Sequence, residues 1–485
     1  MLFNSYEYIF FFLPVTFFLY FYINKKNTEY AKIFLVFASL FFYSWWNIAY
    51  LPLILISMVV NFLIGRELSR HSHNHRKYSA KKLLTVGIIF NLALLGYFKY
   101  SDFFIENINA LFHTNVPLLH LALPLAISFY TFQQIAYLVD SYKEETKEYS
   151  FAHYALFVTF FPQLIAGPIV HHKEMMPQFA KKQNSVKNYY NIALGLFVFS
   201  MGLFKKVVIA DTFAHWATQG FDLSKSLNML EAWSASLSYT FQIYFDFSGY
   251  TDMAIGAALL FNIKLPMNFF SPYKAGNIQE FWRRWHITLS TFLKDYLYIP
   301  LGGNQKGKIR TYINLFLTFL LGGIWHGAGW TFVIWGALHG GALVVHRIWK
   351  QFGLKLPFVL GWFVTFMFVN IAWVFFRANS FDDALKVLKG MFGGAFVLPK
   401  ETTVWIADFA KEQGIIVGKW SNLYLHESGI LWWIIAGFFI ALVLPNSMQL
   451  KDRFKTNWFY LGLTIVFSMA IFMLYRKSEF IYFNF

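Results

Sequence analysis

The stretch that decides the fold is residues 311–349, which read TYINLFLTFLLGGIWHGAGWTFVIWGALHGGALVVHRIW. It holds two apolar segments, 311–330 and 331–349, each near the roughly 20 residues that a helix needs to cross a bilayer. Similar segments recur along the chain, which predicts an all-α membrane protein with roughly eleven to thirteen transmembrane or re-entrant helices. The other segments are expected at 8–23, 32–48, 51–65, 83–100, 118–140, 151–170, 189–210, 232–262, 357–376, 429–446 and 457–475.

The composition supports a membrane protein. Only 14% of the 485 residues are charged, against about 25% in a soluble protein, and 57% are hydrophobic. The net charge of +16 could suggest nucleic acid, but the basic residues fall in short loops between apolar segments, where they set orientation. Membrane lipid is therefore the expected partner, and nucleic acid is not. The absence of cysteine excludes disulfides, Cys metal sites and an acyl-cysteine intermediate.

Charge also predicts the topology. Residues 66–82 hold six Lys or Arg and three His, and we expect this loop to be cytoplasmic. His71, His73 and His75 alternate there without a nearby carboxylate arrangement, so a solvated loop is favoured over a metal site. A full crossing by 151–170 would place the following lysines outside. Because that segment contains two prolines and a glycine, it is expected to be broken or re-entrant.

His326 is the first candidate for chemistry. It lies inside an apolar run, where an ionisable side chain is costly unless it is paired or faces a cavity. An imidazole can take a proton from a hydroxyl near neutral pH. The alternative is a structural histidine bonded to a neighbouring carbonyl, and position alone favours neither.

A second candidate group lies in 281–298, where the apolar spacing predicts one amphipathic helix at a membrane face or cavity wall. His286 could orient a substrate or contact an acyl donor, but its position alone favours an anchor at the lipid headgroups. Arg283 and Arg284 could hold the phosphates of a nucleotide-bearing donor or those of lipid.

Two carboxylates and a C-terminal tyrosine complete the candidates. Asp246 and Asp252 lie in apolar surroundings; they could orient an active-site group, but satisfied structural groups at a helix break are favoured. The last residues, EFIYFNF, are too apolar for a free tail, so we expect them to dock in a groove or in the membrane. Tyr482 would then be either a hydroxyl delivered into a site or an interfacial anchor.

Four strings together resemble the membrane-bound O-acyltransferases, especially the bacterial branch that includes the alginate and peptidoglycan O-acetyltransferases and the D-alanine exporter of teichoic acid synthesis. The strings are DFSGYTDMAI (246–255), FWRRWHITLS (281–290), YIPLGGN (298–304) and GGIWHG (322–327). The resemblance runs from Asn4 to about Arg377. It implies a single integral membrane acyltransferase domain over 1–485, with the family's fold around a central tunnel.

The resemblance also implies a reaction. An acetyl group would pass from cytoplasmic acetyl-CoA, with no bound cofactor or metal, to a hydroxyl that approaches from outside. The histidine that matches His326 is the invariant catalytic one, and the one that matches His286 is its companion in the tunnel. Trp325 lies beside the former and is expected, with the two arginines and two aspartates above, to contact substrate.

The tail 477–485 resembles an aromatic C-terminal motif of the same branch. There a tyrosine is thought to receive the acyl group and relay it to an extracytoplasmic partner with a serine nucleophile, often a lipase-like esterase/transferase. Tyr482 is the matching residue, and with no cysteine present it is the expected covalent way-station. A bacterial inner membrane location follows.

The acceptor is open at this point. The Lys-rich and Phe-rich usage indicates an AT-rich genome, which favours peptidoglycan over alginate or another exopolysaccharide. A non-enzymatic lipid or polysaccharide transporter is the competing class, since many helices and a midplane histidine would suit one. A scaffold for a cell-surface complex is a third.

Overall fold

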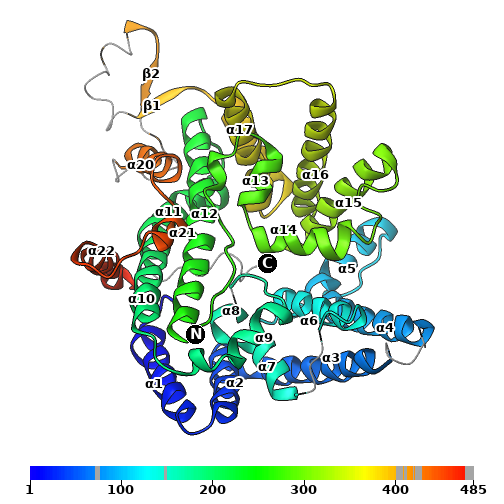
Figure 1. The fold of residues 1–485 in the computed structure, drawn as a ribbon. Coiled ribbons are helices and arrows are strands. Elements are labelled where there is room, and N and C mark those ends of the chain that lie inside the picture. Colours follow the sequence, from blue (N-terminus) through cyan, green and yellow to red (C-terminus); the bar gives the residue numbers. More distant parts are fainter. Residues whose placement is uncertain are drawn as a thin grey trace. The chain divides into compact units, whose positions relative to one another are not determined.

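The computed structural model describes residues 1–71, 77–146, 150–165, 167–399, 408, 412–418, 420 and 429–475. Its regular structure is almost wholly helical (Figure 1), which confirms the all-α prediction. Within these ranges one small parallel sheet pairs β1 (Val397–Pro399) with β2 (Ile416–Gly418). The tail with Tyr482, the loop histidines 73 and 75, and most of 400–428 lie outside the described residues.

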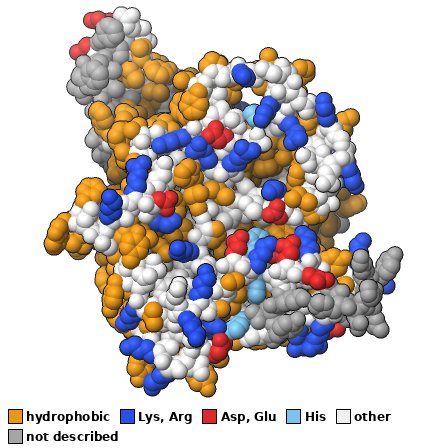
Figure 2. Space-filling view, in the orientation of Figure 1, with side chains coloured by type: hydrophobic (Ala, Val, Ile, Leu, Met, Phe, Trp, Pro, Cys, Tyr) orange, Lys and Arg blue, Asp and Glu red, His pale blue; other side chains and the backbone are white. Residues whose placement is uncertain are grey.

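Six helical stretches are long and apolar enough to cross a membrane, counted over the described ranges only. The segments predicted at 232–262 and 311–330 form helices of 32 and 20 residues that are not among the six. The other predicted segments outside the six form helices of 17 residues or fewer. Large hydrophobic side chains lie at the surface, among them Phe37, Trp432 and Phe363, as expected for helices that face lipid (Figure 2). The six stretches are Glu7–Asn24, Ile48–Arg70, Ser79–Phe112, Tyr189–Leu223, Trp330–Gln351 and Phe358–Arg377.

The chain divides into two compact units. Unit 1 comprises the described residues of 1–204, 249–267 and the segment from 453 onward, and unit 2 those of 205–248 and 268–452. The helix α12 (Met229–Leu260) contributes its first part to unit 2 and its last part to unit 1.

Unit 1 contains the N-terminal helices. The predicted break in 151–170 is confirmed, because Phe160 has ψ 108° and separates two short helices, and the two prolines that follow it, Pro162 and Pro168, are buried. The side chain of Asn27 caps α2 by accepting from the backbone N–H groups of Glu29 and Tyr30. The helices are α1 (Leu13–Asn24), α2 (Thr28–Ser44), α3 (Leu51–His71), α4 (Lys77–Leu95), α5 (Ser101–Phe112), α6 (Ile127–Tyr142), α7 (Phe151–Thr159), α8 (Phe161–Leu164), α9 (His172–Ala180), α10 (Tyr189–Phe204) and α22 (Trp458–Ser468).

Unit 2 contains both candidate histidines. Its helices are α11 (Asp211–Thr218), the first part of α12, α13 (Ile278–Arg284), α14 (Ile287–Leu293), α15 (Gly307–His326), α16 (Trp330–Gln351), α17 (Phe358–Arg377), α18 (Phe381–Gly393), α20 (Ile430–Leu442) and α21 (Ser447–Asp452). Short π-helical turns occupy Lys205–Ala210, Gln219–Leu223 and Lys294–Tyr298.

The hairpin of α15 and α16 is packed through glycines. A Cβ on Gly323 would lie 2.4 Å from the carbonyl oxygen of Phe332, and one on Gly336 would lie 2.6 Å from that of Phe319. Only a residue without a side chain permits such a close approach of two backbones. The deciding stretch 311–349 therefore forms the two predicted helices, and its glycines hold them together.

Two helix predictions are wrong. The expected single helix over 281–298 is broken, because His286 has φ 43° and ψ 56° and α14 starts anew after it. The side chain of Asn268 stabilises this start by accepting from the backbone N–H (3.2 Å) and hydroxyl (3.0 Å) of Thr288. Conversely, the expected helix break around Asp246 and Asp252 is absent, since α12 is continuous there.

Candidate active site

His326 is the last residue of α15 and is buried against three aromatic rings. Its ring centroid lies 4.9 Å from that of Trp325, 5.0 Å from Trp335 on α16 and 5.2 Å from Phe376 on α17. The glycine turn that follows α15 brings α16 back beside it. Three helices thus surround one imidazole with apolar walls, which exclude water and strengthen any electrostatic interaction inside.

An aromatic cluster joins the surroundings of the two histidines. Trp335 stacks on Trp373 at 5.8 Å, and Trp373 lies 5.0 Å from Trp285, the residue before His286. The cluster consists of Trp282, Trp285, Trp335, His339, Trp373 and Phe376. Residues from α13, α16 and α17 that are far apart in sequence therefore form one continuous wall within unit 2.

His286 is fully buried, so the expected role as a headgroup anchor is wrong. Its Nδ1 lies 3.1 Å from Oδ1 of Asn268. That oxygen already accepts from the Thr288 N–H, so Nδ1 donates and Nε2 carries the lone pair. Burial lowers the pKa of the imidazole to about 3, so the ring is neutral at physiological pH. A neutral ring with a defined tautomer can accept a proton or a hydrogen bond.

The two candidate arginines, Arg283 and Arg284, differ in whether their charge is already paired. Arg284 donates from Nη2 (2.7 Å) and Nε (3.0 Å) to Oε1 of Glu280, and from Nη1 to the Phe270 carbonyl. Its charge is therefore largely offset by the carboxylate. Arg283 is exposed, and its guanidinium could reach a phosphate.

Asp246 is paired with a buried lysine. Lys206 Nζ lies 2.6 Å from Asp246 and 2.8 Å from Asp211, and all three side chains are less than 5% exposed. This supports the structural interpretation of Asp246 over contact with substrate. Asp252 is also buried, but it lies on the part of α12 that belongs to unit 1. Trp325 is buried with its ring against His326.

A basic cavity of about 500 Å³ lies in unit 2. Lys294, Arg347 and Lys350 line it, and no Asp or Glu does. Phe319 in its wall contacts Trp282 of the aromatic cluster at 4.7 Å. Neither this cavity nor a role for His339 was predicted from the sequence. The sequence signal for the cavity was the group of basic residues at the end of α16, which the hairpin of α15 and α16 returns toward the basic start of α15.

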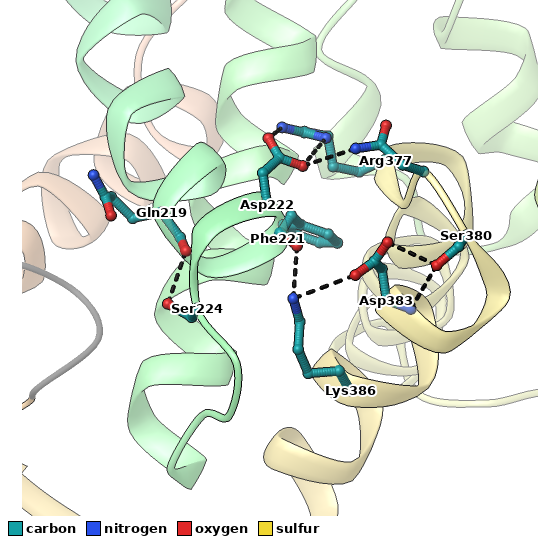
Figure 3. A network of polar contacts seen from close by, with 9 residues as sticks. Gln219, Phe221, Asp222, Ser224, Arg377, Ser380, Asp383 and Lys386 are labelled. Carbon is teal, nitrogen blue, oxygen red and sulfur yellow. Dashed lines mark hydrogen bonds and ion pairs between the residues drawn. The ribbon is translucent and has the colours of Figure 1, made fainter.

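A polar network secures the end of α17 (Figure 3). Arg377 donates to both carboxylate oxygens of Asp222, with an Nη1–Oδ1 distance of 3.0 Å. Lys386 of α18 donates to the Phe221 carbonyl at 2.7 Å. Since Phe376 precedes Arg377, the network holds a ring that contacts His326.

The described residues hold no group of three or more His, Asp or Glu placed to bind a metal ion. Tyr482 lies outside the described residues, so its predicted part in the site stays a prediction.

Comparison with known proteins gives the family. Residues 5–381 match the MBOAT, membrane-bound O-acyltransferase family. A peptidoglycan O-acetyltransferase from Helicobacter pylori is 49% identical over 100% of this chain and 98% of its own length. A protein from Pseudomonas aeruginosa named probable alginate O-acetylase is 41% identical over 81% of this chain and 75% of its own.

A more distant relative, a teichoic acid D-alanyltransferase from Streptococcus thermophilus, is 27% identical over 52% of this chain and 68% of its own. The family match covers His286, His326 and the helices around them. The chain therefore belongs to the membrane-bound O-acyltransferase family and is an O-acyltransferase that crosses a membrane several times.

Proposed function

We propose that this protein moves an acetyl group from cytoplasmic acetyl-CoA across a bacterial inner membrane for O-acetylation of a cell-envelope polysaccharide, with peptidoglycan as the acceptor. The observation that carries the proposal is the buried His326, enclosed by aromatic rings from α15, α16 and α17 within the family's matching segment. The peptidoglycan O-acetyltransferase that matches the whole chain supports the acceptor.

His326 acts as the general base. It removes the proton from an acceptor hydroxyl, and the oxygen attacks the carbonyl carbon of the acetyl thioester. The carbon–sulfur bond breaks, CoA leaves as the thiolate, and the proton held by the imidazole neutralises that thiolate. His286 is neutral and presents a defined tautomer, so it orients a reactant through its unprotonated Nε2.

The basic cavity suits the phosphate-bearing part of the donor. Lys294, Arg347 and Lys350 supply positive charge where CoA carries its phosphates. The start of α15 also carries Lys306, Lys308 and Arg310, and basic loops mark the cytoplasmic side of a membrane protein. The exposed Arg283 could add a further contact.

The first acceptor is the hydroxyl of Tyr482 in the tail 477–485. An acetyl ester on this tyrosine would then pass to the serine of an extracytoplasmic esterase/transferase partner, which acetylates the polysaccharide. The supporting observation is the absence of cysteine, which leaves a hydroxyl as the carrier.

Alginate or another exopolysaccharide is the second candidate acceptor. It is favoured by the relatives from Pseudomonas, although they match less of the chain than the peptidoglycan enzyme does. Membership of an acyltransferase family argues against the transporter and scaffold alternatives, because a transporter leaves its substrate covalently unchanged.

The test compares alkali-labile acetate on purified peptidoglycan from wild-type cells and cells with His326→Ala at matched membrane protein levels. The matched control is His215→Ala, an exposed histidine on α11. We expect loss of acetate in the first variant and no change in the second. Unchanged acetate in His326→Ala would refute the peptidoglycan acceptor, and secreted polysaccharide would be measured next.

A further inference from the structure

Three buried N–H groups of the aromatic cluster have no hydrogen-bond partner among the residues that the structure describes. They are Nε2 of His339 and the indole Nε1 atoms of Trp335 and Trp373. All three side chains are at most 2% exposed. Buried donors in native proteins are nearly always paired, so three in one cluster require an explanation.

The proton on His339 can be assigned. Trp282 Nε1 lies 3.2 Å from His339 Nδ1. An indole N–H can only donate, so Nδ1 is the acceptor. The neutral ring therefore carries its proton on Nε2, which is the buried atom without a partner. His339 is thereby held as a hydrogen-bond donor.

The three donors are neighbours, and they lie beside His326. The ring of Trp335 is 4.7 Å from that of His339 and 5.8 Å from that of Trp373, and it is also 5.0 Å from His326. On the other side, Trp282 links His339 to Phe319, which lines the basic cavity. The rings of Trp335 and His339 thus belong to a chain of ring contacts that runs from the wall of the cavity to His326.

We propose that these N–H groups bind the carbonyl oxygen of the acyl group during transfer, with His339 as the principal donor. This inference rests on the proposed acetyl transfer. As the acceptor oxygen bonds to the carbonyl carbon, the C=O electron pair moves to oxygen, and the N–H groups stabilise the negative charge that develops there. When the pair returns, the carbon–sulfur bond breaks and the thiolate leaves with its electrons and takes the proton held by His326.

The alternative role for His339 is structural, through its bond with Trp282, and isosteric variants separate the two. The amide of His339→Asn reaches the position of Nδ1, so it keeps an acceptor for Trp282 but has no donor at Nε2. The amide of His339→Gln reaches the position of Nε2, so it keeps the donor but loses the Trp282 acceptor. His339→Phe keeps the ring shape and has neither.

The experiment measures first-turnover release of CoA from acetyl-CoA by the purified full chain in detergent, since Tyr482 is the proposed acceptor that the chain itself supplies. His326→Ala is the blank, and the thermal midpoint of each variant is the folding control. We expect the rate constant of this first turnover to fall roughly 100-fold in His339→Asn and His339→Phe, the loss typical of one oxyanion donor. His339→Gln should keep that rate constant within about fivefold of wild type, since its donor remains.

The opposite ranking, with His339→Asn active and His339→Gln inactive, would overturn the inference and assign His339 a structural role. Equal loss in all three variants with lowered thermal midpoints would overturn it as well. If wild type releases no more CoA than the His326→Ala blank, the acetyl-CoA reaction itself is refuted, and the role of His339 falls with it.

Discussion

The buried ion triad of Lys206, Asp211 and Asp246 allows a quantitative prediction. Lys206 Nζ lies within 2.8 Å of both carboxylates, and none of the side chains is more than 4% exposed. Replacing the lysine by methionine keeps the length of the side chain but leaves two carboxylates buried together. Removal of one member of a buried ion pair costs about 3–5 kcal/mol, because the remaining charge has lost both water and partner.

For a unit of this size, each kcal/mol corresponds to roughly 2–4 °C in thermal midpoint. We therefore expect Lys206→Met to lower the midpoint by about 6–20 °C, measured by fluorescence-detected size exclusion after heating in detergent. Asp246→Asn should cost less, because Lys206 keeps Asp211 as a partner. The combination Lys206→Met, Asp211→Asn and Asp246→Asn should recover part of the loss, since no buried charge remains.

The same series decides the role of Asp246. If the carboxylate is structural, Asp246→Asn should retain wild-type acetyl transfer per folded molecule. A midpoint of Lys206→Met within 2 °C of wild type (about 1 kcal/mol or less) would refute the electrostatic reasoning. A large loss of activity in a stable Asp246→Asn protein would instead restore a substrate-contacting role.

Three further predictions concern the hairpin, His286 and the cavity. Gly323→Ala should lower the thermal midpoint, because its Cβ would lie 2.4 Å from the carbonyl oxygen of Phe332. In the control Gly341→Ala the new Cβ has no heavy atom within 4 Å, so this variant should be neutral or stabilised by up to about 1 kcal/mol. Equal thermal midpoints of the two variants would contradict the packing argument. Burial lowers the pKa of His286 in the folded state to about 3, below its value in the unfolded state. Between pH 3 and about 6.5 the unfolded state therefore binds more protons than the folded state. The free energy of unfolding should fall by roughly 1 kcal/mol for each pH unit of acidification in this window. In His286→Asn the asparagine can adopt the φ of 43° found at this position, and stability should depend less on pH than in the wild type. An unchanged pH dependence would show that another group causes the loss of stability in acid. Lys350→Gln should raise the KM for acetyl-CoA roughly tenfold with kcat retained, because Lys350 lines the basic cavity. Lys355→Gln lies outside this cavity and should leave KM unchanged. Equal KM values for the two variants would show that the cavity does not bind the donor.

Hydropathy and a few motifs were sufficient for much of the fold and part of the site. Apolar length predicted the helices around residues 311–349, and the proline-containing segment after residue 150 was expected to break and does. His326 stood out because an ionisable residue in an apolar run is unusual. The ring of Trp325 lies 4.9 Å from that of His326, and the expected contact of Trp325 with substrate stays a prediction. These features depend on neighbours in sequence.

Other features arise only when distant residues meet. Asp246 is paired with Lys206, forty positions earlier, so its surroundings in sequence looked more apolar than its surroundings in space. His286 interrupts a pattern with good helical spacing because Asn268, from a different segment, satisfies the backbone of the next helix. His339 was indistinguishable from an ordinary core histidine until Trp282 and Trp335 were found against it.

The sequence by itself determined that this chain is an all-α membrane acyltransferase with a catalytic histidine candidate at 326. The length of an apolar segment, the distribution of basic residues between loops and the residues of a motif can all be read from neighbouring positions in the sequence, without knowledge of the packing. Only the tertiary structure decided which polar groups are already satisfied and which remain available. Arg284 is paired with Glu280, Asp246 is paired with Lys206, and the buried His339 N–H has no partner among the described residues. Pairing depends on the distance between side chains in space, which spacing along the chain does not give.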